Sequence, residues 1–438
     1  MKIAVIGAGW AGLSAALGLQ RQGHHAVVFE AARIPGGRAR SLHSPRLNAT
    51  IDNGQHILLG AYTETLALMR QLNLPIESRL LRLGLNLQAA DGSFRLRAPV
   101  LPAPWHLLAG MVGMRGLSLP GRFRLVALIH RLKKQRWQLP DSLTVEQWLT
   151  QGHQSIHAMR CFWTPLCLAA LNTPIDQASA QLLANVLRDS LGARRADSDM
   201  LLPRVDLSEL WPAQAARQLD IRYGHAIRHL NTCSTHIAVD NDPFDAVVVA
   251  TSAHSAARLL RQGTPTPAGN EYLARLAAFR YTSIATISLK LQHAWNLPCP
   301  MLMLYDYPDK RQFGQWLFDR SRIAARGSAL QDASLSIVIS NAGALGSHTR
   351  DEIVTGALQQ IREQTRRFKP MPKVLGHELI VEKRATFAAV PNLKRPGNAT
   401  PWPRVWAAGD WTDTGYPAVL EGAVRSGKRA AELIAACR

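Results

Sequence analysis

A glycine-rich turn near the start of the chain limits the available folds more than any other feature. Residues 2–6 form a short, apolar, β-branched run that is typical of a buried parallel strand. The hexad Gly7-Ala8-Gly9-Trp10-Ala11-Gly12 follows at once, residues 13–22 are typical of a helix, and residues 26–29 form a second apolar run before Glu30. A strand, a tight glycine turn, a helix and a second strand predict an α/β fold with a Rossmann-like parallel sheet.

Each part of this unit has a task in binding a dinucleotide. Gly7 makes the tight turn, Gly9 lets the backbone approach a pyrophosphate, and Gly12 lets the helix pack against the strand. The N-terminus of the helix then faces the phosphate charge. Glu30 stands eighteen residues after Gly12, where a carboxylate accepts hydrogen bonds from a ribose diol. The contacts predicted from this unit are Gly7, Ala8, Gly9, Trp10, Ala11, Gly12, Glu30 and Ala31.

A second glycine segment comes a few residues after the ribose carboxylate. Gly36, Gly37 and Arg38 place a flexible backbone and a guanidinium close to the same pyrophosphate. A surface turn with a solvated arginine is the plainer interpretation of the same residues.

The order of these motifs resembles that of the FAD-dependent amine oxidase and phytoene desaturase superfamily, which also has G-x-G-x-x-G, a glutamate and then G-G-R. The C-terminal end resembles the superfamily too, in Ala408–Thr412 and Leu420–Gly427. The resemblance implies that the Gly-Asp pair of the first stretch reaches the ribityl and phosphate region of FAD. It also implies that the following helix points its N-terminus at the flavin. We therefore expect FAD as the cofactor and no metal ion, with contacts from Gly409, Asp410, Leu420 and Glu421.

The resemblance further implies a discontinuous FAD-binding domain and a second, α+β substrate-binding domain. Ile221–Ile227 resembles a superfamily strand in which an aliphatic residue, here Ile227, places its backbone against adenine; a plain edge strand is the alternative. Phe244–Thr251 is a buried-strand run that belongs to the same sheet by resemblance. The elements expected in the second domain are strands at Tyr281–Leu291 and Leu335–Ser340 and a helix at His348–Phe368. The predicted segments are 1–90, 206–262 and 396–438 for the FAD-binding domain and 91–205 and 263–395 for the substrate domain.

Positive charge is concentrated in one segment. The chain has 51 Lys and Arg against 31 Asp and Glu, a formal net charge of +20, and residues 92–140 hold nine of the basic residues and no acidic one. Apolar residues, among them Trp105 and Phe123, are interleaved with them, so the segment is amphipathic. This pattern is typical of a helix at an anionic membrane surface. The alternative is a core segment with a solvated basic face; nucleic-acid binding is not expected, because no recognised module surrounds the segment.

Two further features bear on where the protein works. No apolar run reaches the roughly 18 residues that a membrane span needs. The cysteines are odd in number and form no C-x-x-C pair, which fits neither a disulfide framework nor a zinc site. We expect a cytoplasmic protein that is peripheral on the inner face of the membrane. The cysteines are Cys161, Cys167, Cys233, Cys299 and Cys437.

Several stretches resemble one subgroup of the superfamily, the squalene-associated FAD-dependent enzymes or hydroxysqualene dehydroxylases. Val419 supports this, because amine oxidases have an aromatic wall at that position to orient the amine, and an aliphatic wall suits an isoprenoid. The resemblance implies a long apolar isoprenoid substrate, hydroxysqualene. No second G-x-G-x-x-G follows a strand, so we expect an external electron donor. The stretches are Gly7–Ser14, Asp52–Tyr62, Pro165–Pro174, Leu202–Ser208, Trp316–Arg320 and Arg384–Phe387.

The reaction implied by the resemblance is reductive removal of a hydroxyl group. Protonation lets the allylic hydroxyl leave as water, and a hydride from flavin N5 quenches the cation. In the superfamily the Asp-Asn-Gly turn carries the chain toward the flavin, so Gly54, Gln55 and His56 join the predicted cofactor contacts, and His56 is the candidate acid. A hydrogen-bonded His56 that only shapes the pocket is the alternative. Tyr416 is a weaker candidate acid, and Asp52 is expected to cap a local turn.

Three other functions stay open at this point. A desaturase acting on a carotenoid precursor has the same fold and cofactor but takes electrons out of its substrate. An amine oxidase-like flavoenzyme also takes electrons from its substrate. A non-catalytic lipid- or flavin-binding protein keeps the glycines but needs no proton donor.

Overall fold

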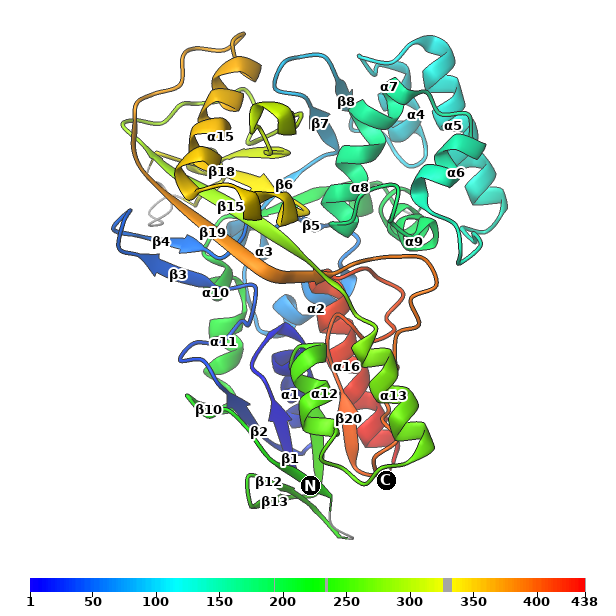
Figure 1. Ribbon diagram of the computed structural model, residues 1–438, viewed down its shortest axis with the longest axis vertical. Coiled ribbons are helices and arrows are strands. Elements are labelled where there is room, and N and C mark those ends of the chain that lie inside the picture. Colours follow the sequence, from blue (N-terminus) through cyan, green and yellow to red (C-terminus); the bar gives the residue numbers. More distant parts are fainter. Residues whose placement is uncertain (193, 233–234, 326–332, 438) are drawn as a thin grey trace.

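The computed structural model describes residues 1–192, 194–232, 235–325 and 333–437. Figure 1 shows a lower part that contains both termini and an upper part built around a long, bent pair of strands. The strands are β1 (Lys2–Ile6), β2 (His25–Glu30), β3 (Ser41–Ser44), β4 (Ala49–Asp52), β5 (Leu58–Leu59), β6 (Leu80–Leu83), β7 (Asn86–Gln88), β8 (Arg95–Arg97), β9 (Met200–Pro203), β10 (Asp220–Tyr223), β11 (Leu230–Thr232), β12 (Ile237–Val239), β13 (Asp242–Phe244), β14 (Ala246–Val249), β15 (Tyr281–Leu291), β16 (Met301–Met303), β17 (Trp316–Asp319), β18 (Ser334–Ile339), β19 (Val374–Phe387) and β20 (Val405–Ala407).

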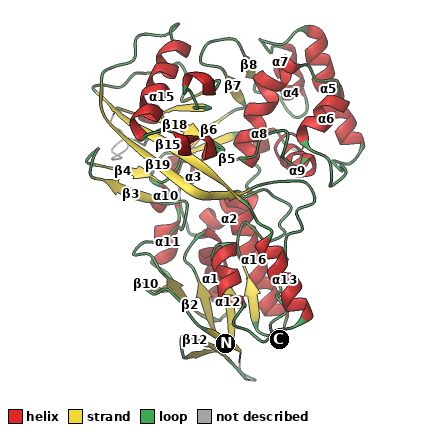
Figure 2. Cartoon of the chain, viewed as in Figure 1, coloured by secondary structure: helices red, strands yellow, loops and turns green. Residues whose placement is uncertain are grey.

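The helices lie mainly in three groups, around the lower sheet, beside the upper sheet, and at the upper right of the view (Figure 2). They are α1 (Trp10–Arg21), α2 (Thr63–Gln71), α3 (Ile76–Arg79), α4 (Trp105–Val112), α5 (Leu119–Lys134), α6 (Val145–Gln151), α7 (Ile156–Ala158), α8 (Thr164–Leu171), α9 (Ala180–Leu191), α10 (Leu207–Leu210), α11 (Pro212–Ala216), α12 (Ala253–Leu260), α13 (Pro267–Ala277), α14 (Arg320–Ile323), α15 (Arg350–Gln364) and α16 (Leu420–Ala436). A π-helical turn joins α7 to α8 at Met159–Trp163, and short 3₁₀ helices cover Arg195–Ser198, Pro308–Lys310 and Ala342–Ser347.

A five-stranded parallel sheet in the order β10-β2-β1-β14-β20 forms the lower part. Its strands come from residues 2–30, 220–249 and 405–407, so three distant stretches of chain build one sheet. Each stretch falls in one of the three segments expected to form the FAD-binding domain. The α/β, Rossmann-like fold class is confirmed, and the domain boundaries stay a prediction.

The parallel sheet is buried on both faces. Because side chains alternate along a strand, Ile3 and Val5 of β1 join the core of α1 and α16, while Ala4 and Ile6 join the core of α12 and α13 on the other face. Helices α1 and α16 pack very closely: a Cβ atom on Gly427 would overlap the carbonyl oxygen of Ala11. The first and last helices of the chain are thereby packed together on one face of the parallel sheet.

The upper part is α+β. Its sheet is antiparallel, in the order β16-β17-β18-β15-β19, and α15 packs against it through Ile353, Ala357 and Ile361. The long strands β15 and β19 run from this sheet down toward the FAD-binding part (Figure 1). Helices α4 to α9 gather beside the sheet and form a helical cover (Figure 2).

Several elements differ in length from their predictions. The first helix begins at Trp10 rather than at residue 13, because extended Gly9 accepts the first helical hydrogen bond from Leu13. The predicted strand Ile221–Ile227 ends at Tyr223, where Gly224 takes a positive φ of 68°. The run Phe244–Thr251 is divided between the end of β13 and β14.

The other predicted elements differ less from the structure. β15 spans Tyr281–Leu291 as predicted, and β18 begins one residue earlier than predicted and ends at Ile339. The helix predicted at His348–Phe368 is α15, which is shorter at both ends. It begins after Thr349, which caps its N-terminus, and it ends at Gln364.

The basic segment contains both a core face and an exposed face. Leu125, Leu128 and Leu132 of α5 are buried, as the core interpretation requires. Trp105, on α4, and Phe123, on α5, are exposed by 63% and 75%. None of the described helices is long and apolar enough to cross a membrane.

Candidate cofactor and substrate site

A cleft of about 690 Å³ runs between the parallel sheet and the upper part of the molecule. It brings together residues from the first, middle and last stretches of the chain. Of the predicted cofactor contacts, Gly7, Gly9, Trp10, Ala11, Glu30, Ala31, Gly36, Gly37, Arg38, Gly54, Gln55, His56, Ile227, Gly409, Asp410 and Leu420 line this cleft. Ala8, Gly12 and Glu421 do not line it.

The three glycines of the first turn have the different environments that their tasks require. Gly7 has a φ of +109°, which only glycine adopts readily, and a Cβ there would lie 2.7 Å from the carbonyl oxygen of Ala250. A Cβ on Gly12 would overlap the carbonyl oxygen of Gly7, so this glycine allows the helix to pack on the strand. A Cβ on Gly9 would meet nothing closer than the Cα of Gly37 at 3.9 Å. The space above Gly9 is therefore open to the cleft, as the pyrophosphate of a dinucleotide requires.

Two charged groups of the cleft, the Glu30 carboxylate and the Arg38 guanidinium, are fixed by hydrogen bonds. The Glu30 carboxylate accepts hydrogen bonds from the amides of Ala8 (2.7 Å) and Ala32 (2.8 Å), which fixes it at the end of β2. Arg38 donates to Asp410 (2.7 Å), and so joins the G-G-R segment to the C-terminal Gly-Asp pair. Burial alone would lower the pKa of Arg38, but the charge of Asp410 and its hydrogen bond raise the pKa, so the guanidinium stays charged. One fixed cation thus faces the part of the cleft where phosphates are expected.

His56 lies in the cleft, half-buried, with its ring held by the backbone. Nδ1 lies 2.9 Å from the carbonyl oxygen of Gly54. Because a carbonyl oxygen only accepts, Nδ1 carries the proton, and Nε2 is the free nitrogen of the neutral ring. Burial lowers the pKa of His56, and the charge of Arg38 lowers it further, against the effect of the Gly54 hydrogen bond. The neutral ring is therefore favoured at pH 7.

Asp52 does not cap its own turn, contrary to the prediction. Its carboxylate accepts a hydrogen bond from the amide of Leu207 at the start of α10 (2.9 Å) and pairs with Arg320 (3.4 Å). Arg320 also donates to the side-chain oxygen of Gln55 (3.0 Å). Burial raises the pKa of Asp52 to about 6, although Arg320 opposes the shift. Asp52 thus orients the chain before His56 through contacts with distant elements, which its sequence neighbours do not indicate.

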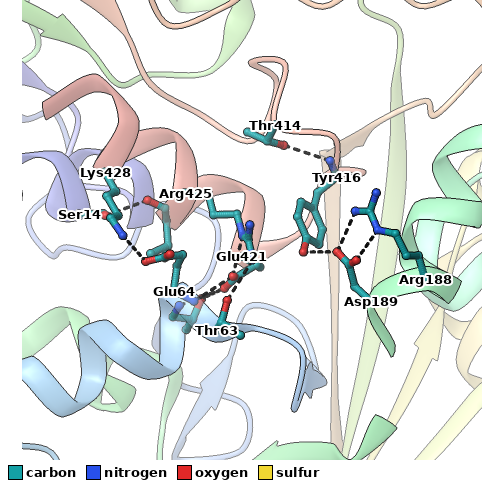
Figure 3. A network of polar contacts seen from close by, with 12 residues as sticks. Ser14, Thr63, Glu64, Arg188, Asp189, Thr414, Tyr416, Glu421, Arg425 and Lys428 are labelled. Carbon is teal, nitrogen blue, oxygen red and sulfur yellow. Dashed lines mark hydrogen bonds and ion pairs between the residues drawn. The ribbon is translucent and has the colours of Figure 1, made fainter. Parts of the chain in front are cut away.

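Glu421 is buried outside the cleft, where it holds α2 to α16 (Figure 3). Its carboxylate accepts hydrogen bonds from the amides of Glu64 and Thr65 (both 3.0 Å), and from the Thr65 hydroxyl (2.7 Å). Arg425, one turn later in α16, pairs with it at 2.8 Å. A carboxylate at the first turn of α2 is stabilised by unpaired amides and by the helix dipole. We predicted a cofactor contact for Glu421, because it stands at the start of the helix expected to face the flavin. In the structure Glu421 instead anchors α2 to α16.

A second cavity, which we call the apolar chamber, adjoins the cleft. It has a volume of about 160 Å³ and is lined mainly by Leu, Met, Ile, Val and Ala side chains from the upper part and from α4, α8 and α9. Val419 lines both cavities, so the aliphatic residue noted in the sequence stands between them. The residues shared by the two cavities are Ile57, Tyr62, Ala169, Ala170, Trp316 and Val419.

The apolar chamber contains residues that sequence reasoning missed. Tyr416, the weaker candidate acid, lines this chamber and not the cleft, and it donates a hydrogen bond to Asp189 of α9. Asp189 and Tyr62 were not predicted to have a function. Tyr62 ends the quoted stretch Asp52–Tyr62, which was its only signal in the sequence. Asp189 had no such signal, because its contact with Tyr416 joins residues that are 227 positions apart.

Comparison with known proteins agrees with this geometry. The sequence profile of flavin containing amine oxidoreductases matches residues 10–435. The chain belongs to this family. Hydroxysqualene dehydroxylase from Rhodopseudomonas palustris is 29% identical over 457 aligned residues, covering 99% of this chain and 98% of that protein. Hydroxysqualene dehydroxylase from Sinorhizobium fredii is also 29% identical, over 455 residues, covering 98% of this chain and 97% of that protein.

A solved structure extends the comparison to the fold. Cyclohexylamine oxidase from Brevibacterium oxydans superposes with a TM-score of 0.70 at 18% identity, covering 99% of this chain and 98% of that one. The family establishes this protein as an FAD-dependent oxidoreductase, and the predicted cofactor is confirmed. The open space above Gly9, the Glu30 carboxylate and the Arg38–Asp410 pair fit the pyrophosphate and ribose of FAD.

Proposed function

We propose that this protein reduces hydroxysqualene to squalene, with FAD as cofactor and with electrons from an external donor. The observation that carries the proposal is the apolar chamber beside the cleft, with Val419 between the two cavities. Such a chamber suits a segment of a hydrocarbon chain, and Val419 puts an aliphatic side chain where amine oxidases have an aromatic wall. The similarity to hydroxysqualene dehydroxylases along nearly the whole chain supports the same substrate.

The reaction is balanced by one proton and one hydride: the allylic alcohol gains both, and squalene and water are formed. Reduced FAD, when bound, supplies the hydride. The chain itself holds the cofactor through the glycine turns and Arg38, and its apolar chamber keeps water away from the allylic cation. His56 remains our proposed proton donor, because it is the titratable residue that the Asp-Asn-Gly turn places in the cleft. Because burial lowers its pKa, only a minor fraction of His56 is protonated at neutral pH.

The proposal includes a place at an anionic membrane surface. Trp105, Leu108 and Val112 lie three and four residues apart on α4 and are all exposed. Val100, Leu101, Leu119, Phe123 and Ile156 extend the set of exposed apolar side chains around α4 and α5. Exposed basic residues of the same segment, among them Lys133, Lys134 and Arg136, supply charge for anionic headgroups. We name these exposed apolar and basic residues the α4–α5 face.

The same helix connects this face to the chamber. Leu107 and Met111 of α4 line the apolar chamber, whereas Trp105, Leu108 and Val112 face outward. A substrate dissolved in a bilayer therefore needs to pass only one helix to reach the chamber. This supports a peripheral position on the inner face of the membrane for a cytoplasmic enzyme.

The direction of electron flow separates this function from its nearest alternative. Anaerobic holoenzyme would be incubated with hydroxysqualene after photoreduction, and with phytoene in the oxidised state, and the products analysed. We expect squalene from the first reaction and no desaturated product from the second. Desaturation of phytoene without squalene formation would replace our proposal by that of a desaturase.

A further inference from the structure

The apolar chamber has one region that is polar. Of its lining residues, those with polar side-chain groups are Tyr62, Asp189, Ser190, Ser198, Trp316 and Tyr416. The hydroxyl protons of the two serines are already used, because Ser190 donates to the Val186 carbonyl (2.7 Å) and Ser198 to the Arg195 carbonyl (2.7 Å). The indole N–H of Trp316 is buried without a partner among the described residues and is closed off from the cavity surface. This leaves the Tyr62 hydroxyl as the donor available to a ligand and Asp189 as the charged acceptor, which Tyr416 helps to hold.

Among the described residues, Asp189 is the only charged one that lines the chamber. Arg188 donates to both of its oxygens (2.6 and 3.2 Å), and the Tyr416 hydroxyl donates to Oδ2 (Figure 3). Burial raises the pKa of Asp189, but these hydrogen bonds and the charges of Arg188 and Arg425 bring it below the ordinary value, so the group is a carboxylate. A carboxylate accepts about four hydrogen bonds. Three are made, and one acceptor position is therefore left on Oδ1.

Tyr62 is more than nine-tenths buried and lines both the chamber and the cleft. No described residue is hydrogen-bonded to its hydroxyl group. Burial raises the pKa of Tyr62, and the neighbouring Glu421 and Tyr416 raise it further, so the O–H group remains a donor throughout the physiological range. The Tyr62 hydroxyl is not among the closed-off polar atoms of the described residues, so it reaches the cavity surface, where it can donate to a ligand.

The network around Glu421 fixes these groups relative to one another. Tyr62 precedes α2, whose first amides are held by Glu421. Arg425 pairs with Glu421 and lies over the ring of Tyr416, 4.8 Å from its centroid. The loop before α16, the start of α2 and the end of α9 thus meet at one wall of the chamber (Figure 3).

We propose that Tyr62, Asp189 and Tyr416 form an alcohol-binding site, at which the Tyr62 hydroxyl donates to the substrate oxygen and Asp189 accepts the substrate's hydroxyl proton. This rests on the proposed function and names the residues that recognise its alcohol. Tyr62 lines both cavities, so an alcohol bound to it lies at the wall shared with the cleft, in which His56 lies. An alcohol has one donor and two acceptor positions, which match this pair. A hydrocarbon of the same length leaves Tyr62 unsatisfied. The site therefore selects the hydroxylated substrate over its own product, squalene.

The test measures binding without turnover. Oxidised holoenzyme, which has no hydride to transfer, would be titrated with hydroxysqualene and with squalene in one detergent, and the change in the visible absorption of bound flavin followed. We expect the parent to bind the alcohol at least about tenfold more tightly, as a charge-assisted hydrogen bond provides. Asp189→Asn and Tyr62→Phe should each lower this preference about five- to tenfold and leave squalene binding unchanged. Tyr272→Phe, which removes a tyrosine hydroxyl that is bonded to Gly397, at a buried residue that lines neither cavity, is the control and should keep the parental preference.

Two outcomes overturn the site. Equal binding of alcohol and hydrocarbon by the parent would do so, even if the enzyme turns hydroxysqualene over. An equal loss of affinity for both ligands in Tyr62→Phe would show that Tyr62 only supports the structure of the chamber. If Asp189→Asn does not fold, Tyr62→Phe alone tests the site. A parent that prefers the alcohol, with the preference lost in the variants, but forms no squalene after reduction would keep the site and reject the proposed reaction.

Discussion

Within the glycine-rich turn, an added side chain has a different consequence at each glycine. At Gly7 and Gly12 it would collide with backbone atoms and damage the fold, whereas at Gly9 it would project into the cleft. We predict that Gly9→Val folds but loses FAD, because the side chain takes the place of the pyrophosphate. Visible absorption per protein should fall below about a tenth of the parental value, with an unchanged circular dichroism spectrum. Gly84→Val, at an exposed glycine with open space around it, is the matched control; full flavin occupancy in Gly9→Val would contradict the dinucleotide site.

His56 provides the second residue-scale prediction. If His56 donates the proton, His56→Ala should keep FAD and flavin reduction but slow hydroxysqualene reduction by about 10²- to 10⁴-fold. The acid is active only when protonated, and burial lowers its pKa below the ordinary 6.5. The parental rate should therefore fall as the pH rises, with its midpoint below about 6.5, and this dependence should vanish in His56→Ala. A His56→Ala enzyme with the parental rate would show that His56 only shapes the pocket.

The roles of residues that stand inside a sequence motif were predictable from the sequence. The roles of residues that depend on contacts with distant parts of the chain were not. Gly9 and Arg38 are recognisable because their neighbours define the turn. Asp189, by contrast, lies 227 positions before Tyr416 in the chain, and nothing near it in sequence indicates that partner. Glu421 was assigned to the cofactor from its position in the motif, although its partners Glu64 and Thr65 are more than 350 residues away.

At the scale of elements, α16 and α2 are held together by one buried carboxylate. Glu421→Ala removes the partner of two helix amides and of Arg425, and we predict a loss of about 2–4 kcal/mol in the free energy of unfolding. Glu432→Ala is the control on the same helix: its pair with Arg429 is exposed and should contribute less than about 0.5 kcal/mol. Chemical denaturation of the FAD-saturated proteins measures both. Equal stabilities would contradict the anchoring role of Glu421.

The α4–α5 face gives a prediction for membrane binding. We expect co-sedimentation with anionic liposomes that weakens in 1 M salt, where the Debye length is about 3 Å. Charge reversal at Lys133, Lys134 and Arg136 should weaken it as well, and Phe123→Glu should weaken binding even at low salt. Leu375→Glu, at an exposed leucine of β19, is the control. Equal binding of neutral and anionic vesicles would reject the electrostatic part of the proposal.

Element identities were predicted better than element ends. The predicted bounds of β15 match the structure, in which β19 pairs with it from Tyr281 to Leu291 and β18 from Ala285 to Lys290. The end of β10 was missed, because Gly224 stops the strand through its backbone conformation, and the apolar pattern continues past it to Ile227. For the basic segment, the sequence could not assign individual apolar residues to the core or the surface, since both faces of α5 carry them.

For the whole molecule, the main structural feature is that three distant stretches of the chain form one parallel sheet. The resemblance to a flavoenzyme superfamily predicted this arrangement, and local patterns alone did not. The apolar chamber was not predictable, because its walls come from elements between β5 and the loop before α16. The chamber and the cleft share a wall, and in the proposed function this wall places the isoprenoid chain beside the cofactor site.

The most direct test of the central claim is a single turnover. Anaerobically photoreduced holoenzyme would be mixed with hydroxysqualene, and the return of the oxidised flavin spectrum followed together with the product. The account predicts reoxidation of the flavin with one squalene formed per FAD, and no reoxidation with squalene itself. Flavin that stays reduced while hydroxysqualene remains unchanged would contradict it.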